Sequence, residues 1–375
     1  MEIGIVGLPN AGKSTLFNAL TRAGAVVASY PFTTIDPNIG VAALEDPRLA
    51  ALAALIKPEE VVPATVTFVD IAGLVRGAHR GEGLGNQFLG HIRNVDAIVM
   101  VLRCFEDPDV PHVAPTLDPA ADLATLDTEL ALADLVTVER RLEKERSAAK
   151  ANPKAHAETI RHLEALRERL NRGERAVDLS PYAPPLLGEG QGEGAAARAL
   201  AQELNLLTAK PRLLVANVSE RDLPGGGPYA EVVRRLAAAE GSEAIVLSAQ
   251  TEMELAEWDP AEAAAYREAL GLKVSGLQAL VAASYRLLDL ITFFTVAGER
   301  VVRAWPIKRG TLAPQAAGKV HSDMERGFIR AEVIPVEALL AAGSWAAARE
   351  HGLIRVEGRT YVVQDGDVIL FRFQV

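Results

Sequence analysis

The sequence predicts an α/β fold: a mostly parallel sheet with helices on both faces, an inserted α-helical hairpin and a smaller C-terminal α+β domain. Three observations lead to it. Short apolar segments alternate with helical patterns over residues 1–118 and again over 200–288. Residues 120–172 contain almost no Gly or Pro, and short strand-like segments fill residues 289–375. We therefore expect the hairpin and its linker, residues 119–199, to be inserted into the sheet domain.

The first domain is predicted to contain strands that are buried on both faces. Residues 3–6, 66–69 and 97–102 are short and almost wholly apolar, and residues 212–216 and 244–247 repeat this character. Such runs are typical of strands inside a parallel sheet. The helical patterns between them would supply the crossover connections that parallel neighbours need.

Two long helices are predicted between residues 120 and 172, with a turn at Asn152-Pro153. Apolar residues recur there at steps of three and four: Leu123, Leu126, Leu130 and Ala133, then Ile160, Leu163, Leu166 and Leu170. This spacing predicts an antiparallel hairpin with coiled-coil packing. Its charged faces are most simply solvated, and a partner contact is the alternative.

The C-terminal domain is predicted to be built from short strands. Residues 292–296, 301–305, 360–363 and 368–373 are rich in β-branched and aromatic residues. Residues 364–367, with the sequence QDGD, indicate a hairpin turn between the last two.

Composition limits the possible partners. The formal net charge is −10, so no overall basic field attracts nucleic acid or anionic lipid, although a local basic patch is allowed. The apolar runs are too short to span a bilayer, and Met1 leads directly into the first strand, so we expect no signal peptide. Cys104 is the single cysteine, which excludes an internal disulfide. A cytoplasmic monomer without membrane contact is expected.

The most informative motif is GLPNAGKS at residues 7–14, a complete G-x-x-x-x-G-K-S between a predicted strand and a predicted helix. This context distinguishes a phosphate-binding loop from a glycine turn that precedes a lysine by chance. Lys13 would add positive charge and Ser14 a hydroxyl for Mg²⁺, while main-chain N–H groups contact the phosphates. The expected nucleotide-binding residues of this loop are Asn10, Ala11, Gly12, Lys13, Ser14 and Thr15.

Further residues suggest a sensor for the γ-phosphate. Asp70 ends a strand and can hold Mg²⁺ through water, and the Gly73 N–H can approach the γ-phosphate. Thr34, favoured over Thr33, lies in a Pro-flanked loop and can close over Mg²⁺; alone it would be a solvated hydroxyl. Leu74 stands where many GTPases place the glutamine that orients water. Another group must therefore act, or turnover must be slow.

These residues resemble the Obg-type P-loop GTPases of the TRAFAC class, specifically the Obg-like ATPases of the YchF subfamily. The matching segments are residues 7–15 (GLPNAGKST), 31–38 (PFTTIDPN), the glycine-rich 73–85, and 303–307, 316–323 and 327–331. The last three resemble the family's TGS domain, which implies a β-grasp, ubiquitin-like fold. The resemblance implies slow hydrolysis of ATP to ADP and phosphate, and a ribosome-associated role in translation or stress.

The base pocket favours ATP over GTP. A guanine-specific relative would carry Asn-Lys-x-Asp, whereas residues 217–220 read NVSE. A site built to accept two hydrogen bonds from guanine loses its preference when that arrangement is lost. We expect Asn217 and Val218 beside the adenine. Ser248 is either a base contact or a helix N-cap, and a GTP-specific enzyme of the Obg group is the alternative for the whole site.

Two groups are candidates for the missing catalytic function. By resemblance, Asn10 occupies the position that helps bind K⁺ in potassium-dependent relatives, and His112 matches a loop histidine proposed as catalytic in the YchF family. A surface imidazole is the alternative for His112. Lys13 and Mg²⁺ would supply the charge stabilisation.

Two functions remain open at this point: an ATPase switch whose partner affinity depends on the nucleotide, and a nucleotide-stabilised adaptor in which hydrolysis is incidental. A cleft between the hairpin and the TGS-like domain could admit RNA, with scattered solvated charges as the alternative. The basic residues concerned are Arg300, Arg303, Lys308, Arg309, Lys319, Arg326 and Arg330.

Overall fold

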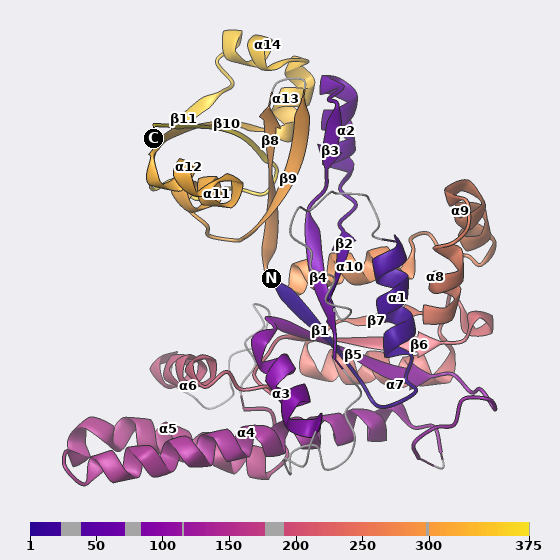
Figure 1. The fold of residues 1–375 in the computed structure, drawn as a ribbon, viewed down its shortest axis with the longest axis vertical. Coiled ribbons are helices and arrows are strands. Elements are labelled where there is room, and N and C mark those ends of the chain that lie inside the picture. The colour runs from indigo at the N-terminus through magenta and orange to yellow at the C-terminus, as the bar shows by residue number, and fades with distance from the viewer. Residues whose placement is uncertain (24–38, 72–83, 115, 177–190, 298–299, 375) are drawn as a thin grey trace. The chain divides into compact units, whose positions relative to one another are not determined.

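The computed structural model describes residues 1–23, 39–71, 84–114, 116–176, 191–297 and 300–374. Thr34, Gly73 and Leu74 lie outside these residues. The chain divides into two compact units, whose elements are labelled in Figure 1. The first contains Thr67–Leu287 and most of the chain before Ala42, and the second combines Ala42–Val66 with the chain from Leu288 onward.

The first unit is built on a sheet with the strand order β2-β4-β1-β5-β6-β7. β1 pairs in parallel with β4 and β5, and β6 and β7 continue the parallel sheet. The strands are β1 (Glu2–Val6), β2 (Ile39–Ala43), β4 (Thr65–Asp70), β5 (Ala97–Cys104), β6 (Arg212–Val218) and β7 (Ala244–Leu247). All residues of β5 and β6 are buried, which confirms the expectation of coverage on both faces for these two strands. In β4 and β7 buried and half-buried residues alternate, so the same expectation is wrong there.

Helices cover both faces of this sheet, as Figure 1 shows. One face carries α1 (Lys13–Ala23), α8 (Ala249–Leu255) and α10 (Gly276–Leu287). The other carries α3 (Leu84–Asn94), α4 (Pro119–Ala149) and α7 (Gly227–Glu240). None of the described helices combines the length and apolar character needed to cross a bilayer.

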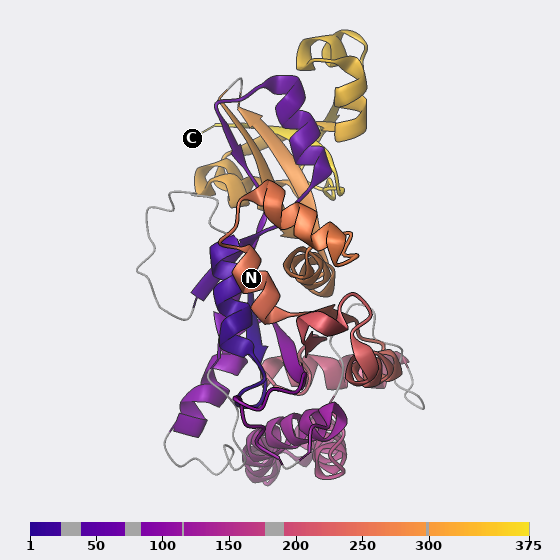
Figure 2. The same ribbon diagram turned by 90° about the vertical axis from the view of Figure 1, so that its right-hand side faces the viewer.

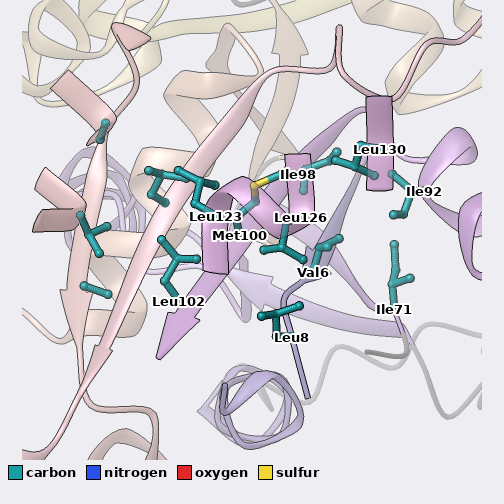
Figure 3. Packing of buried hydrophobic residues seen from close by; sticks show 14 of the residues in the cluster. Val6, Leu8, Ile71, Ile92, Ile98, Met100, Leu102, Leu123, Leu126 and Leu130 are labelled. Carbon is teal, nitrogen blue, oxygen red and sulfur yellow. The ribbon is translucent and has the colours of Figure 1, made fainter. Parts of the chain in front are cut away.

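The first half of α4 packs against the sheet of the first unit. Leu123, Leu126 and Leu130 are buried in one cluster with Ile98 and Met100 of β5 (Figure 3). The sequence predicted that these leucines pack within the hairpin, and this prediction is wrong. Their spacing defines an apolar face of the helix, but the spacing does not determine which surface covers it.

The hairpin itself begins further along α4. Val138 and Leu142 pack with Leu163 and Leu166 of α5 (Pro153–Asn171), and with residues of α6 (Gln191–Glu203). Figures 1 and 2 both show α4 and α5 side by side. The predicted turn at Asn152-Pro153 is confirmed, since Pro153 occupies the first turn of α5, where a missing N–H costs nothing.

The second unit has a sheet with the order β11-β10-β12-β8-β9-β3. Its elements are α2 (Pro47–Ile56), β3 (Glu60–Val62), β8 (Leu290–Ala297), β9 (Val301–Lys308), α11 (Ala313–Val320), α12 (Ser322–Arg326), β10 (Phe328–Pro335), α13 (Val336–Ala342), α14 (Trp345–Glu350), β11 (Arg355–Glu357) and β12 (Asp367–Phe373). β8 runs antiparallel to β9 and parallel to β12.

The second unit takes one edge strand from the N-terminal part of the chain. β3 pairs in parallel with β9, and Arg48 of α2 forms a two-pronged ion pair with Asp365 at 2.8 and 3.3 Å. The sequence assigned this segment to the first domain. The difference arises because three residues of β3 form their ladder with a strand far downstream, which no local pattern indicates.

The C-terminal chain has an aromatic core. Phe293, Phe328 and Phe371 form its aromatic core, with Phe293 edge-on to Phe371 at 5.9 Å. The strand predicted at 360–363 is wrong, because only Val362 forms a bridge there, to Leu312. The TGS assignment stays a prediction.

Candidate functional site

The loop between β1 and α1 has a backbone conformation that depends on an asparagine and a glycine. Asn10 and Gly12 adopt left-handed conformations, with φ of 63° and 92°. The positive φ already favours glycine at position 12. The available space requires it as well, since a Cβ there would lie 2.1 Å from Nδ2 of Asn217. The Leu16 N–H donates to the Gly12 carbonyl at 2.9 Å and so starts α1 directly after the loop.

Lys13 is the buried cation of this loop. It is 7% exposed, and its Nζ donates to the Leu8 carbonyl at 2.9 Å. Burial lowers the pKa of Lys13, and the nearby Asp70 carboxylate partly opposes this effect. A bound phosphate group would satisfy an ammonium that the protein alone compensates poorly.

Ser14 and Asp70 lie together because of strand register. β1 and β4 are parallel, and Ile5 is paired with Asp70, so the end of β4 adjoins the loop. Ser14 Oγ donates to Asp70 Oδ2 at 3.2 Å. Asp70 Oδ1 is buried and has no hydrogen-bond partner among the described residues. A hydroxyl and an unsatisfied carboxylate oxygen are the hard ligands that Mg²⁺ prefers, so these residues fit the metal that the motif implies.

A cavity of about 590 Å³ adjoins the loop at the carboxyl ends of β5 and β6. Lys13 and Ser14 line one part of it, and Val218 and Glu220 line another. The remaining lining residues are Asn10, Gly12, Thr15, Phe105, Glu106, Asp107, Val110, Asn217, Ser219, Ser248, Gln250, Thr251 and Glu254. Ligands of open parallel sheets bind at this end of the strands.

Asn217 connects the loop to the opposite wall of the cavity. Its Nδ2 donates to the Ala11 carbonyl at 2.9 Å, and its Oδ1 accepts from the Ala249 N–H at 2.9 Å. The side chain is only 4% exposed. Asn217 therefore fixes the two walls of the cavity relative to each other, in addition to any contact with a base.

Residues after β6 and β7 form the part of the cavity farther from the loop. Ser248 is the N-cap of α8, and its Oγ accepts from the Thr251 N–H at 3.3 Å, as one of the two interpretations predicted. Glu220 accepts hydrogen bonds from the Thr251 hydroxyl at 3.3 Å and the Tyr266 hydroxyl at 3.0 Å. Sequence reasoning missed Thr251 and Tyr266, which belong to no local motif.

His112 and Asn10 are already engaged within the protein. His112 Nε2 lies 3.0 Å from Asp122 Oδ2 of α4, and Nδ1 accepts from the Ala114 N–H at 3.1 Å. His112 is not among the cavity-lining residues, whereas Asn10 is, and Asn10 Nδ2 donates to the Pro111 carbonyl at 2.9 Å. The roles assigned to both residues stay predictions.

Several basic residues of the C-terminal domain have protein partners. Arg309 pairs with Asp289 at 3.1 Å, Arg326 pairs with Asp323, and Arg303 lies over the Trp305 ring at 3.9 Å. The two ion pairs partly offset the charges of Arg309 and Arg326, whereas Arg303 keeps its charge over the ring.

Together, the left-handed loop, the buried lysine, the Ser–Asp pair and the cavity at the strand ends define a P-loop nucleotide-binding domain. A family model described as "50S ribosome-binding GTPase" matches residues 2–140. The model YchF-GTPase_C, described as "Protein of unknown function (DUF933)", matches residues 290–374.

Full-length relatives show the family. One from Bacillus subtilis (strain 168), named ribosome-binding ATPase YchF, is 49% identical over 379 residues and both chains are covered completely. A relative of the same name from Escherichia coli O157:H7 is 47% identical, covering 100% of this chain and 99% of its own. A solved structure, that of the Schizosaccharomyces pombe YchF GTPase, is 35% identical with a TM-score of 0.85, covering 99% of this chain and 97% of that one. The chain belongs to the YchF family, and the predicted P-loop α/β fold is confirmed.

Proposed function

We propose that the chain binds ATP in the cavity beside Lys13, hydrolyses it slowly to ADP and phosphate, and associates with the ribosome. One observation carries the choice of base: Val218 and Glu220, in place of the lysine and aspartate of a guanine-specific motif, line the same cavity as Lys13 and Ser14. The names of the Bacillus and Escherichia relatives, ribosome-binding ATPases, support the activity and the partner.

The phosphate end acts by position and charge. Lys13 would contact the phosphates in place of the Leu8 carbonyl, and main-chain N–H groups at the start of α1 would complete the contacts. Ser14 and Asp70 would hold Mg²⁺, with Thr34 as the third predicted residue. Bound Mg²⁺ neutralises charge that develops on the phosphate oxygens.

Hydrolysis is expected to be slow because Leu74 cannot orient water. Unassisted switch proteins turn over at about 10⁻² s⁻¹ or below, and we propose that range here. His112 as a catalytic group and K⁺ near Asn10 are separate proposals that rest on resemblance. Hydrolysis by a His112→Ala variant at the wild-type rate would contradict the first, and equal rates in K⁺ and Na⁺ would contradict the second.

The base choice is tested by calorimetric titration of ADP and GDP side by side in the presence of Mg²⁺. Tighter binding of ADP is the expected result. Tight GDP with no detectable ADP would instead indicate a GTP-specific protein of the Obg group. If neither nucleotide binds, the cavity is not a nucleotide site.

The partner is tested by co-sedimentation with ribosomes in ADP and in a non-hydrolysable ATP analogue. A nucleotide-dependent difference supports a switch, and equal binding in both supports an adaptor in which hydrolysis is incidental. Absence of co-sedimentation in either state would refute the ribosome as the partner. Contact with RNA through the hairpin or the C-terminal domain is a further proposal, and competition by ribosomal RNA in the same assay tests it.

A further inference from the structure

Glu220 is restrained by two side chains from the following helices. Its Oε1 accepts from the Tyr266 hydroxyl of α9 (Pro260–Ala269) at 3.0 Å, and its Oε2 accepts from the Thr251 hydroxyl of α8 at 3.3 Å. Thr251 is 4% exposed, and Glu220 itself lines the cavity. Tyr266 therefore supplies a donor to one carboxylate oxygen, and Thr251 supplies one to the other, although the Thr251 hydroxyl also lies 2.9 Å from Ser248 Oγ and has a single hydrogen for the two acceptors.

Tyr266 is held in turn by its surroundings. Its ring packs against Trp258, with ring centroids 5.3 Å apart, so the hydroxyl is presented to Glu220 from a supported position. A phenol keeps its proton at neutral pH, and the hydrogen bond to Glu220 raises the pKa of Tyr266 further, so the hydroxyl remains a donor.

We propose that Tyr266, assisted by Thr251, is a positioning residue for base selection: it keeps the Glu220 carboxylate from accepting the paired donors of a guanine. A guanine offers two adjacent N–H donors, and a carboxylate can accept both only with two free, correctly turned oxygens. Adenine makes no such demand. The proposal rests on the proposed ATP-binding function and adds a cause for its selectivity that lies outside residues 217–220.

The test replaces Tyr266 by Phe, which removes the hydroxyl and keeps the ring against Trp258. We expect ADP binding to be unchanged and GDP binding to strengthen. The ratio Kd(GDP)/Kd(ADP), measured by calorimetry with Mg²⁺, should fall by about tenfold or more, the value of one hydrogen bond to a charged group. Thr251→Val should shift the ratio in the same direction.

A double variant identifies the group responsible. In Tyr266→Phe with Glu220→Gln, the gain in GDP affinity should disappear, because a glutamine amide cannot accept both guanine donors. The matched control is Tyr361→Phe, which removes a phenol–carboxylate hydrogen bond of 2.7 Å to Asp367 in the second unit. This control should leave the ratio unchanged.

Three outcomes would overturn the proposal. Equal weakening of ADP and GDP by Tyr266→Phe would show a merely structural role. A selective loss of ADP would show that Glu220 is held in place to serve adenine, and a ratio unchanged within about twofold would show no role in selection. A wild-type protein that does not prefer ADP would refute the proposed function itself, which the wild-type titration reveals before any variant is measured.

Discussion

Replacing Asn217 by Ala should destabilise the first unit, because this side chain joins two walls of the cavity. The change removes hydrogen bonds of 2.9 Å to the Ala11 carbonyl and from the Ala249 N–H. Both alanines are almost fully buried, at 2% and 1% exposure. A buried group that loses its partner costs about 1–3 kcal/mol. Loss of both hydrogen bonds would therefore cost about 2–6 kcal/mol. Because water can enter the adjoining cavity and hydrate the two groups, we expect the free energy of unfolding to fall by the lower part of this range, about 2–4 kcal/mol.

The measurement is urea unfolding of the nucleotide-free protein, followed by circular dichroism. Hydrogen exchange of peptides from β6 and α8 would assign the affected transition to the first unit. Asn171→Ala, at an exposed position at the end of α5, is the matched control and should change the free energy of unfolding by less than about 0.5 kcal/mol.

Nucleotide binding provides a second readout of the same variant. Asn217→Ala should weaken ADP and GDP together, since the loop loses its support irrespective of the base. If the free energy of unfolding changes by less than about 0.5 kcal/mol, the two hydrogen bonds do not hold the cavity walls and the reasoning fails.

Three further predictions concern the phosphate end and the core. Ser14→Ala or Asp70→Asn should reduce the effect of Mg²⁺ on ATP affinity by about tenfold; an unchanged Mg²⁺ dependence in calorimetry would exclude them as ligands. Burial lowers the pKa of Lys13 from 10.5, and phosphate should raise it again. At a pH between the lowered pKa of Lys13 in the free protein and its raised pKa in the complex, ADP binding should therefore take up part of a proton, and the affinity should fall as the pH rises through that interval. Titrations at several pH values in buffers of different ionisation enthalpy measure the uptake, and no uptake at any pH would contradict this. Burial raises the pKa of Cys104 to about 12, so a thiol reagent should label it only after denaturation. Labelling of the native protein at the unfolded rate would refute that burial.

The phosphate end of the site could be predicted because its determinants are local or follow from strand register. The glycines and lysine of residues 7–14 stand between an apolar strand and a helix, and this context specifies the loop. Asp70 ends a strand parallel to β1, which is sufficient to place it near Ser14. Thr34, Gly73 and Leu74 lie outside the described residues, and their roles stay predictions.

The features that escaped prediction depend on partners distant in the sequence. The leucines of α4 identify an apolar face, but their partner is β5 rather than α5. Thr-Tyr-Val-Val at residues 360–363 has strand propensity, yet forms only one bridge. The restraint on Glu220 comes from Tyr266, a single residue of a later helix that no spacing rule indicates.

Because β3 and α2 belong to the second unit, they affect which fragments of this protein can fold on their own. A polypeptide cut at Leu288 would leave β9 with an open backbone edge, since Glu60–Val62 would be missing. Such an edge invites pairing between molecules. Asp365 would also lose Arg48, its ion-pair partner. A fragment that begins where the C-terminal family model matches, at residue 290, is therefore prone to self-association, and supplying residues 42–66 as a separate peptide should suppress it.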